Sequence, residues 1–453
     1  MPAGFVDFPP SGRYWLRDGR VPTTLLAEPV PELVADAEGL AQVDLEIVGA
    51  VVARIAPAGA APADAAGVRL DGGQVWPCFV DLHTHLDKGH IWQRAPNPDG
   101  TFAAAIRTVA TDRAARWTAE DVSRRMDFGL RCSFAHGTRA IRTHLDSLGP
   151  QAAISWPVMR ALRQRWAGRV ELQAASIVPV ETFTSPDGEH LADLVADAGG
   201  ILGGVTYMSP ALDAQLDRAL ALAAERGLGL DFHVDESGDP GARSLVHIAR
   251  AALRHRFAGP IVCGHCCSLA MQPPEVVEET LDLVKQAGIA IVTLPMCNLY
   301  LQNRDPGRTP HWRGVTLLHE MKTRGIPVAV ASDNCRDPFH GYGDHDMLEV
   351  FREATRIAHL DRPHGDWPRA VTSTPADLMG LAPVGRLGAG LPADLVLFRS
   401  RHWSELLSRP QSDRVVVRAG RVLDEPVRAT CHHHSCGTRR PEGRECAGPC
   451  RTQ

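Results

Sequence analysis

Lysine is nearly absent from this chain of 453 residues. It occurs only at Lys88, Lys285 and Lys322, so 45 of the 48 basic residues are arginines. The basic residues form no dense run, and the formal net charge is −5. Nucleic acids and anionic membranes attract proteins with concentrated positive charge. We therefore expect neither of them to be the main partner.

Long apolar segments are also missing. No apolar run approaches the ~20 residues that a membrane-spanning helix needs. The first twenty residues have neither the basic start nor the apolar core of a signal peptide. We therefore predict a cytoplasmic protein. Its apolar segments contain or adjoin seven cysteines, which we expect to be buried free thiols, namely Cys78, Cys132, Cys263, Cys266, Cys267, Cys297 and Cys335.

Short apolar runs alternate with helical patterns along most of the chain. Such alternation predicts parallel β-strands joined by helices, and eight units predict an α/β fold of the TIM-like (β/α)₈ barrel type. The predicted strands cover residues 79–82, 140–143, 170–177, 202–206, 229–232, 260–263, 290–294 and 328–331. Helical spacing of apolar residues predicts helices at 119–131, 212–226, 273–287 and 347–359.

The two ends of the chain differ from this central part. Apolar and polar residues alternate at 43–48 and 51–55, and again at 393–398 and 415–420. We expect the two ends to pair into one small β-domain beside the central part. The predicted limits are 1–74 and 385–429 for the two parts of this domain and 75–384 for the barrel.

The last segment, 430–453, contains four cysteines and three consecutive histidines. Its cysteine spacings match no compact zinc pair, and no apolar residues surround them. We predict a disordered tail there rather than a metal site.

Two histidines one residue apart follow the first barrel strand. His83 and His85 emerge on the same face of a strand, because side chains alternate between its faces. Two imidazoles on one face make half of a metal site. The pair alone also fits an ordinary polar strand end, and we interpret His136 and His144 in that ordinary way.

Further ligand-type residues follow later strands. His233 comes at the end of the fifth strand, His265 after the sixth and Asp333 after the eighth. Catalytic groups of a barrel collect at the C-terminal ends of its strands, so we expect these residues to meet His83 and His85. Several imidazoles with one carboxylate suit zinc or iron, and an open coordination position makes such a site catalytic.

Several short stretches carry a resemblance to a known family. They are HTHLD at 83–87, AIRTHLD at 140–146, FHVDE at 232–236, GHCCSLA at 264–270, NLYLQNR at 298–304 and SDNCRDPF at 332–339. On these stretches the chain resembles the amidohydrolase superfamily and, within it, the bacterial cytosine deaminase-like family, over about residues 40–420. The resemblance implies a barrel and a small β-sandwich domain formed by the N- and C-terminal segments.

The resemblance implies a set of roles. It makes one divalent metal ion, zinc or iron, the cofactor, with four ligands, His83, His85, His233 and Asp333. It assigns His265 to hold the attacking water and Glu236 to shuttle protons. A bound dication lowers the pKa of water to roughly 7, so metal-bound hydroxide is the expected nucleophile. Asp333 is placed to take the water proton, and Glu236 to protonate a ring nitrogen and the departing amine.

One metal ion is expected rather than two. Binuclear relatives bridge their metals with a carboxylated lysine from the fourth strand, and residues 201–210 contain no lysine. Lys88, in the loop after the first strand, is expected to be a surface or substrate-facing charge. A mononuclear centre favours release of ammonia from an amino-substituted ring carbon. The alternative is cleavage of another C–N bond, by alkylamine release from a triazine or by opening of a cyclic amide.

The chain departs from cytosine deaminase at three positions that the resemblance assigns to substrate binding. Asn334 replaces a second acid, Phe339 replaces a stacking tryptophan, and Glu181 stands nearest to a glutamine that reads the pyrimidine edge. The substrate is therefore expected to be a small heterocycle such as cytosine, 5-methylcytosine, isocytosine or a similar compound. A catalytically silent barrel is a third hypothesis, but it predicts lost ligands and none is lost. Relatives often form homo-oligomers, and the sequence leaves the oligomeric state open.

Overall fold

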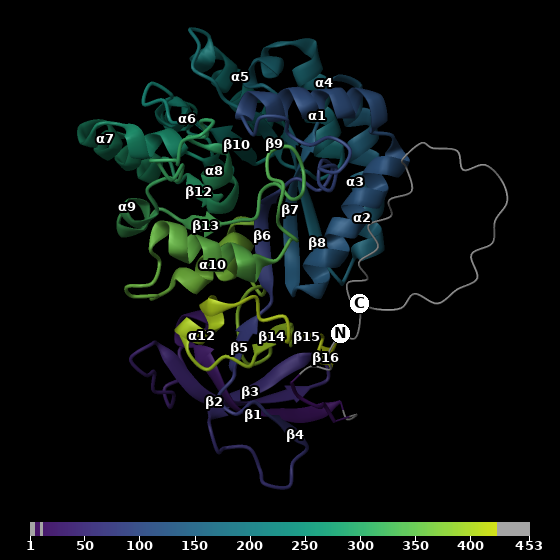
Figure 1. Ribbon diagram of the computed structural model, residues 1–453, viewed down its shortest axis with the longest axis vertical. Helices are drawn as coiled ribbons and strands as arrows, with labels where there is room; N and C mark the ends of the chain where they lie inside the picture. The colour runs from purple at the N-terminus through teal and green to yellow at the C-terminus, as the bar shows by residue number, and fades with distance from the viewer. Residues whose placement is uncertain (1–4, 10–11, 424–453) are drawn as a thin grey trace, which may run out of the picture.

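Eight short parallel strands form the centre of the larger part of the molecule (Figure 1). The computed structural model describes residues 5–9 and 12–423. The limits of the eight predicted strands lie within three residues of those observed. The strands are β6 (Phe79–Thr84), β7 (Thr138–Asp146), β8 (Glu171–Ile177), β9 (Leu202–Val205), β10 (Leu230–Val234), β11 (Ile261–His265), β12 (Ala290–Thr293) and β13 (Val328–Val330).

Helices connect these strands and cover them. The four predicted helices correspond to α2, α5, α7 and α10. Apolar residues at helical spacing explain the burial of α10 on one side, where Met347, Leu348, Phe351 and Ala354 are inaccessible to solvent. The helices are α1 (Phe102–Arg116), α2 (Ala119–Ala135), α3 (Ala152–Trp166), α4 (Pro186–Asp197), α5 (Leu212–Arg226), α6 (Ser244–His255), α7 (Pro274–Gln286), α8 (Pro295–Leu301), α9 (Leu318–Thr323), α10 (Met347–Ala358), α11 (Ser373–Leu378) and α12 (Trp403–Ser408).

Short 3₁₀ turns complete the connections. They are η1 (Thr23–Leu25), η2 (Gly149–Gln151), η3 (Val180–Thr184), η4 (Cys267–Met271) and η5 (Trp367–Val371). No helix in the described part of the chain is long and apolar enough to cross a membrane.

The parallel strands follow the order of a barrel, but their ladder is interrupted at two seams. One sheet runs β13-β12-β11-β10-β9 and the other β6-β7-β8. Isolated bridges span the seams, Ala175–Ile201 and Pro179–Val205 between β8 and β9 and Thr84–Asp333 beyond β13. Both seams involve the short strands β9 and β13. The described residues therefore form the expected strand order without one continuously hydrogen-bonded barrel.

Small and branched side chains fill the interior between the strands. Val80 and Leu82 of β6 pack in one buried cluster with Val262 of β11 and Val292 of β12. Ala376 of α11 belongs to the same cluster. The strands are therefore held by apolar packing from opposite sides, and their C-terminal ends remain free to carry polar side chains.

The two chain ends pair with each other, as expected, and form one mixed sheet of eight strands. A single sheet results because β1 pairs with β2 along one edge and with β4 and then β5 along the other. The order is β16-β15-β14-β5-β1-β2-β3, with β4 beside β1. The strands are β1 (Arg13–Pro22), β2 (Leu40–Val48), β3 (Val51–Pro57), β4 (Gly67–Arg69), β5 (Gln74–Pro77), β14 (Leu395–Phe398), β15 (Val415–Arg418) and β16 (Arg421–Val422).

This terminal sheet leads directly into the central strands. Only Cys78 separates β5 from β6. Trp76 of β5 is fully buried and lies at the centre of an aromatic cluster, with ring centroids 5.9 Å from Phe79, 5.8 Å from Phe351 and 5.7 Å from Trp403. The seven expected free cysteines are all buried and unpaired. The predicted tail, 430–453, lies outside the described residues.

Gly203 of β9 generates a prediction about stability. A Cβ atom at this position would lie 2.3 Å from the backbone oxygen of Ser176 and 2.6 Å from that of Asp231. We expect Gly203→Ala to destabilise the protein by about 1–3 kcal/mol, since backbone must move to accept the methyl group. Thermal unfolding checks this against Gly12→Ala, whose Cβ meets nothing within 4 Å. Equal melting temperatures of the two variants would contradict the expectation.

Candidate metal centre and active site

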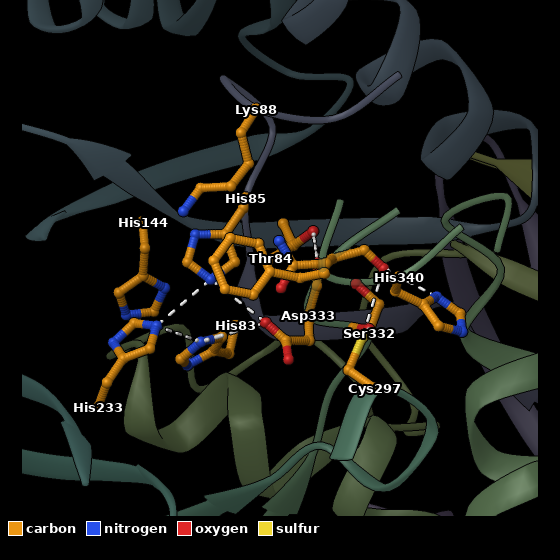
Figure 2. A network of polar contacts seen from close by, with 12 residues as sticks. His83, Thr84, His85, Lys88, His144, His233, Cys297, Ser332, Asp333 and His340 are labelled. Atoms are coloured by element: carbon orange, nitrogen blue, oxygen red, sulfur yellow. Dashed lines mark hydrogen bonds and ion pairs between the residues drawn. The ribbon is translucent and has the colours of Figure 1, made fainter. Parts of the chain in front are cut away.

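Three imidazoles and one carboxylate converge at the C-terminal ends of the central strands (Figure 2). The Nε2 atom of His233 lies 3.1 Å from that of His83 and 3.3 Å from that of His85. Asp333 Oδ1 lies 3.2 Å from His85 Nε2 and 3.8 Å from His83 Nε2. All four residues are buried. The structure thus brings together the four residues that the sequence suggested as ligands.

This arrangement fits a divalent cation. Zinc with ligand bonds of 2.0–2.2 Å in a tetrahedral site holds its ligand atoms about 3.3 Å apart. The four distances given above, 3.1 Å to 3.8 Å, are close to this value. Burial lowers the pKa of His83, His85 and His233 well below its usual value, which favours the neutral imidazole that binds metals. Both carboxylate oxygens of Asp333 are buried and accept no hydrogen bond from the described residues. A cation would supply the missing partner.

Backbone contacts fix Asp333 beside β6. Its amide donates to the carbonyl of His83 over 2.8 Å, and its own carbonyl accepts from the Thr84 hydroxyl over 2.8 Å. Asp81 accepts from the amide and the hydroxyl of Ser332. Asp333 has a φ of 64°, in the left-handed region that non-glycine residues rarely adopt. The contacts hold this unfavourable conformation and aim the carboxylate at the imidazoles.

His144 also belongs to this cluster, although the sequence analysis treated it as an ordinary polar residue. Its ring centroid lies 3.9 Å from that of His83, and its Nε2 lies 3.1 Å from Asp231 Oδ1. Arg142 donates to the same carboxylate over 2.9 Å. The signal that could have found it is its place at the end of a barrel strand, which His83 and His233 share.

A second group of polar side chains lies next to Asp333. The Asn298 amide donates to His265 Nδ1 over 3.0 Å and to Glu236 Oε1 over 3.1 Å. Because His265 accepts at Nδ1, its proton lies on Nε2, which has no other partner among the described residues. Glu236, His265 and Asp333 each offer an atom within 4.8 Å of the others. Asn298 was not among the predicted site residues, although it begins the stretch at 298–304, one of those that carry the resemblance.

Burial sets the protonation of this second group. It lowers the pKa of His265 to about 4, so that the imidazole is neutral near pH 7. Burial, with the negative charge of Asp333, raises the pKa of Glu236 well above its usual value. A carboxylic acid that holds its proton near neutrality can act as a general acid.

A cavity of about 200 Å³ opens beside these residues. His85, His233, Glu236, His265 and Asp333 line one side of it. The remaining wall is mainly aromatic and aliphatic, with Phe102, Ile106, Val109, Leu148, Val178, Tyr207 and Phe339. A larger hollow, of about 820 Å³, lies against α8 and α10 and is lined by none of the residues that converge here.

Two of the three predicted substrate contacts line the cavity, and the third does not. Asn334 and Phe339 line the cavity, and the Asn334 amide donates to Asp337 over 2.7 Å. Glu181 lies in η3, where it is exposed and does not line the cavity. The turn that follows β8 directs its buried side chains, Val180 and Phe183, inward instead.

Lys88 lies inside the cavity, which agrees with the substrate-facing alternative and not with the surface alternative. It is 5% exposed, lines the cavity and lies 3.0 Å from Asp146, which also pairs with Arg113 over 2.8 Å. Figure 2 shows its side chain on the same side of the cluster as His85. The cavity therefore has charged residues at one part of its wall.

Comparison with known proteins decides the family. The sequence profile described as "Amidohydrolase family" matches residues 159–432. A pterin deaminase of Rhizobium rhizogenes is 52% identical over 430 residues, which cover 94% of this chain and 97% of the relative. The chain belongs to the amidohydrolase family. As a member, it is a metal-dependent hydrolase that acts on C–N bonds other than peptide bonds.

More distant amidohydrolases agree in fold. An N-isopropylammelide isopropyl amidohydrolase of a Pseudomonas species is 27% identical over 78% of this chain and 86% of its own length. The crystal structure of a 5-methylcytosine deaminase from Klebsiella pneumoniae, with 5-fluorocytosine, matches with a TM-score of 0.77 at 23% identity. It covers 91% of this chain and 97% of that chain. The His-rich cluster described above is typical of metal sites in this family.

His233 and His144 generate a prediction about metal binding. Loss of a residue that only supports a metal ligand lowers metal affinity roughly 10–100-fold. We expect His233→Ala to lower the affinity for zinc by more than this, because the substitution removes a ligand. His144→Gln should stay within that range if its ring only packs on His83. Competition with a chromophoric chelator measures both affinities. An equal loss in the two variants would make His144 a ligand.

Proposed function

We propose that this amidohydrolase is a hydrolytic deaminase that releases ammonia from a pterin-type heterocycle. The observation that carries the proposal is the 52% identity to a pterin deaminase over almost the full length of both chains. The expected cytosine-like substrate has weaker support, since the 5-methylcytosine deaminase structure shares only 23% identity and indicates the fold alone.

The cavity supports a planar aromatic substrate. Phe102 and Phe339 pack edge to face with ring centroids 5.6 Å apart, and Tyr207 and Leu148 contribute further apolar surface. Flat rings bind well between such walls. Lys88, paired with Asp146, supplies charge and hydrogen-bonding groups for the polar edge of the ring system. Pterin, a bicyclic aminoheterocycle, presents both an aromatic face and such an edge.

One divalent cation, zinc or iron, is the proposed cofactor, with His83, His85, His233 and Asp333 as its ligands. A cation bound there lowers the pKa of water to roughly 7. A single ion is proposed at this centre because β9 carries no lysine that could bridge two metal ions there.

Three side chains then divide the proton transfers among them. Asp333 accepts a proton from the attacking water, and the Nε2–H of His265 donates a hydrogen bond to the oxygen that gains negative charge. Glu236 donates its proton to a ring nitrogen, takes up the proton of the hydroxyl group added to the ring carbon and delivers it to the departing amino group. The carbon–oxygen bond forms first, the carbon–nitrogen bond then breaks as this oxygen becomes a carbonyl, and ammonia leaves. The proton held by Asp333 returns to Glu236 through solvent and restores both groups. Asn298 positions His265 and Glu236 through its two donated hydrogen bonds.

A substrate panel tests the proposal. We expect the zinc-loaded or iron-loaded protein to release ammonia from pterin with a kcat/KM well above those for cytosine, 5-methylcytosine and isocytosine. Ammonia release and product mass are the measurements, and an N-alkylated triazine in the panel detects alkylamine release. An active metal-loaded protein that forms only an alkylamine or a ring-opened product would replace deamination with the alternative. Inactivity on every aminoheterocycle would remove the proposal.

Glu236 provides a sharper test of the chemistry. We expect Glu236→Gln to lower kcat/KM by about 10²–10⁴-fold while leaving the metal content unchanged, because the amide cannot donate the acidic proton. Glu279→Gln, at an exposed position on α7, is the matched control and should retain full activity. Turnover near that of the unmodified protein would exclude Glu236 from proton transfer.

A further inference from the structure

A second cluster of ligand-type side chains lies away from the candidate catalytic centre. His90 follows β6, Cys335 follows Asp333, and His345 precedes α10. Their ligand atoms all lie within 4.8 Å of one another. We propose that His90, Cys335 and His345 bind a second metal ion, of the zinc class, whose role is structural.

The spacing of the imidazoles fits coordination of one ion. His90 Nε2 and His345 Nε2 lie 3.2 Å apart, close to the roughly 3.3 Å between two nitrogens on a tetrahedral zinc ion. The Cys335 and His345 side chains are almost fully buried, and His90 is partly buried. Two imidazoles and a thiolate are ligand types that zinc prefers.

The backbone brings the three ligands together at a conformational cost. The His90 amide donates to the Cys335 carbonyl over 3.1 Å, and the Trp92 amide donates to the Arg336 carbonyl over 2.8 Å. His90 and His345 have φ values of 63° and 54°, in the left-handed region. Non-glycine residues there cost roughly 1–2 kcal/mol each and are concentrated at functional sites. Both imidazoles are thus held in place by unfavourable backbone conformations.

Helix α2 closes the site from the outside. The ring of Phe128 packs against His90 with a centroid distance of 4.8 Å. Gly129 leaves room for His345, since a Cβ atom there would lie 3.0 Å from His345 Nε2. One turn further along the helix, Cys132 adds another buried thiol near Cys335. This enclosure distinguishes the cluster from a catalytic site, which must stay open to a substrate.

The position of the cluster explains what a metal ion would do there. His90 belongs to the loop that follows β6 and contains His85, and Cys335 and His345 belong to the loop between β13 and α10, which contains Asp333. An ion would cross-link these two loops and so hold His85 and Asp333 at their separation. Binding replaces the thiol proton of Cys335 with the metal and releases that proton to solvent.

Cobalt(II) spectroscopy of the full chain tests the site, because a thiolate ligand adds a charge-transfer absorption that imidazole and carboxylate ligands lack. The tail cysteines are first replaced by serine, at Cys431, Cys436, Cys446 and Cys450. We expect this protein to bind about two cobalt ions and to show the thiolate band. Cys335→Ser should abolish the band and lower the content by about one ion, whereas the matched control Cys78→Ser keeps both.

Two further measurements make the outcome decisive. His233→Ala should lose an ion while keeping the thiolate band, which separates this site from the candidate catalytic centre. If Cys335→Ser does not fold, titration of the parent protein decides alone. Saturation at one ion without a thiolate band would overturn the proposal, and so would a band that persists in folded Cys335→Ser.

Discussion

The structure of the site depends on a buried carboxylate without a hydrogen-bond donor. Asp333 is 1% exposed, and neither of its oxygens accepts a hydrogen bond from the described residues. Burying an uncompensated charge costs several kcal/mol, so the surroundings are arranged for a positive partner. The imidazoles of His83 and His85 face the carboxylate, and the contact between Asp333 and β6 spans the seam where the strand ladder is interrupted.

Sequence reasoning predicted the parts of the fold that follow from local periodicity. The eight strands and four helices follow from apolar periodicity, and the expected convergence of His83, His85, His233, His265 and Asp333 follows from the rule that catalytic groups collect at strand ends. The pairing of the terminal strands did not follow from either. Alternation predicted that the two ends form one β-domain, but it did not specify that β1 pairs with β2 on one edge and with β4 and β5 on the other. Such pairing is decided by tertiary packing, which a single sequence does not display.

The hardest side chains to place were those whose position depends on distant partners or on the geometry of a turn. Asn298 lies on a short helix, and its importance follows from two hydrogen bonds to residues more than thirty positions away. For Lys88 the sequence left a surface and a substrate-facing position open, and its contact with Asp146 at 3.0 Å inside the cavity favours the second. Glu181 was chosen by alignment to a distant relative, and the turn η3 places it outside the cavity. Long-range pairing and turn geometry are the physical reasons for these differences.

The direct passage from β5 to β6 has a mechanical consequence. A single residue, Cys78, separates a strand of the terminal sheet from the strand that carries His83, and Trp76 anchors the junction in an aromatic cluster. There is no linker at this point that could act as a hinge. Rotation of the terminal sheet would therefore shift His83, a proposed metal ligand, so that the terminal sheet and the candidate metal centre are mechanically coupled through this junction.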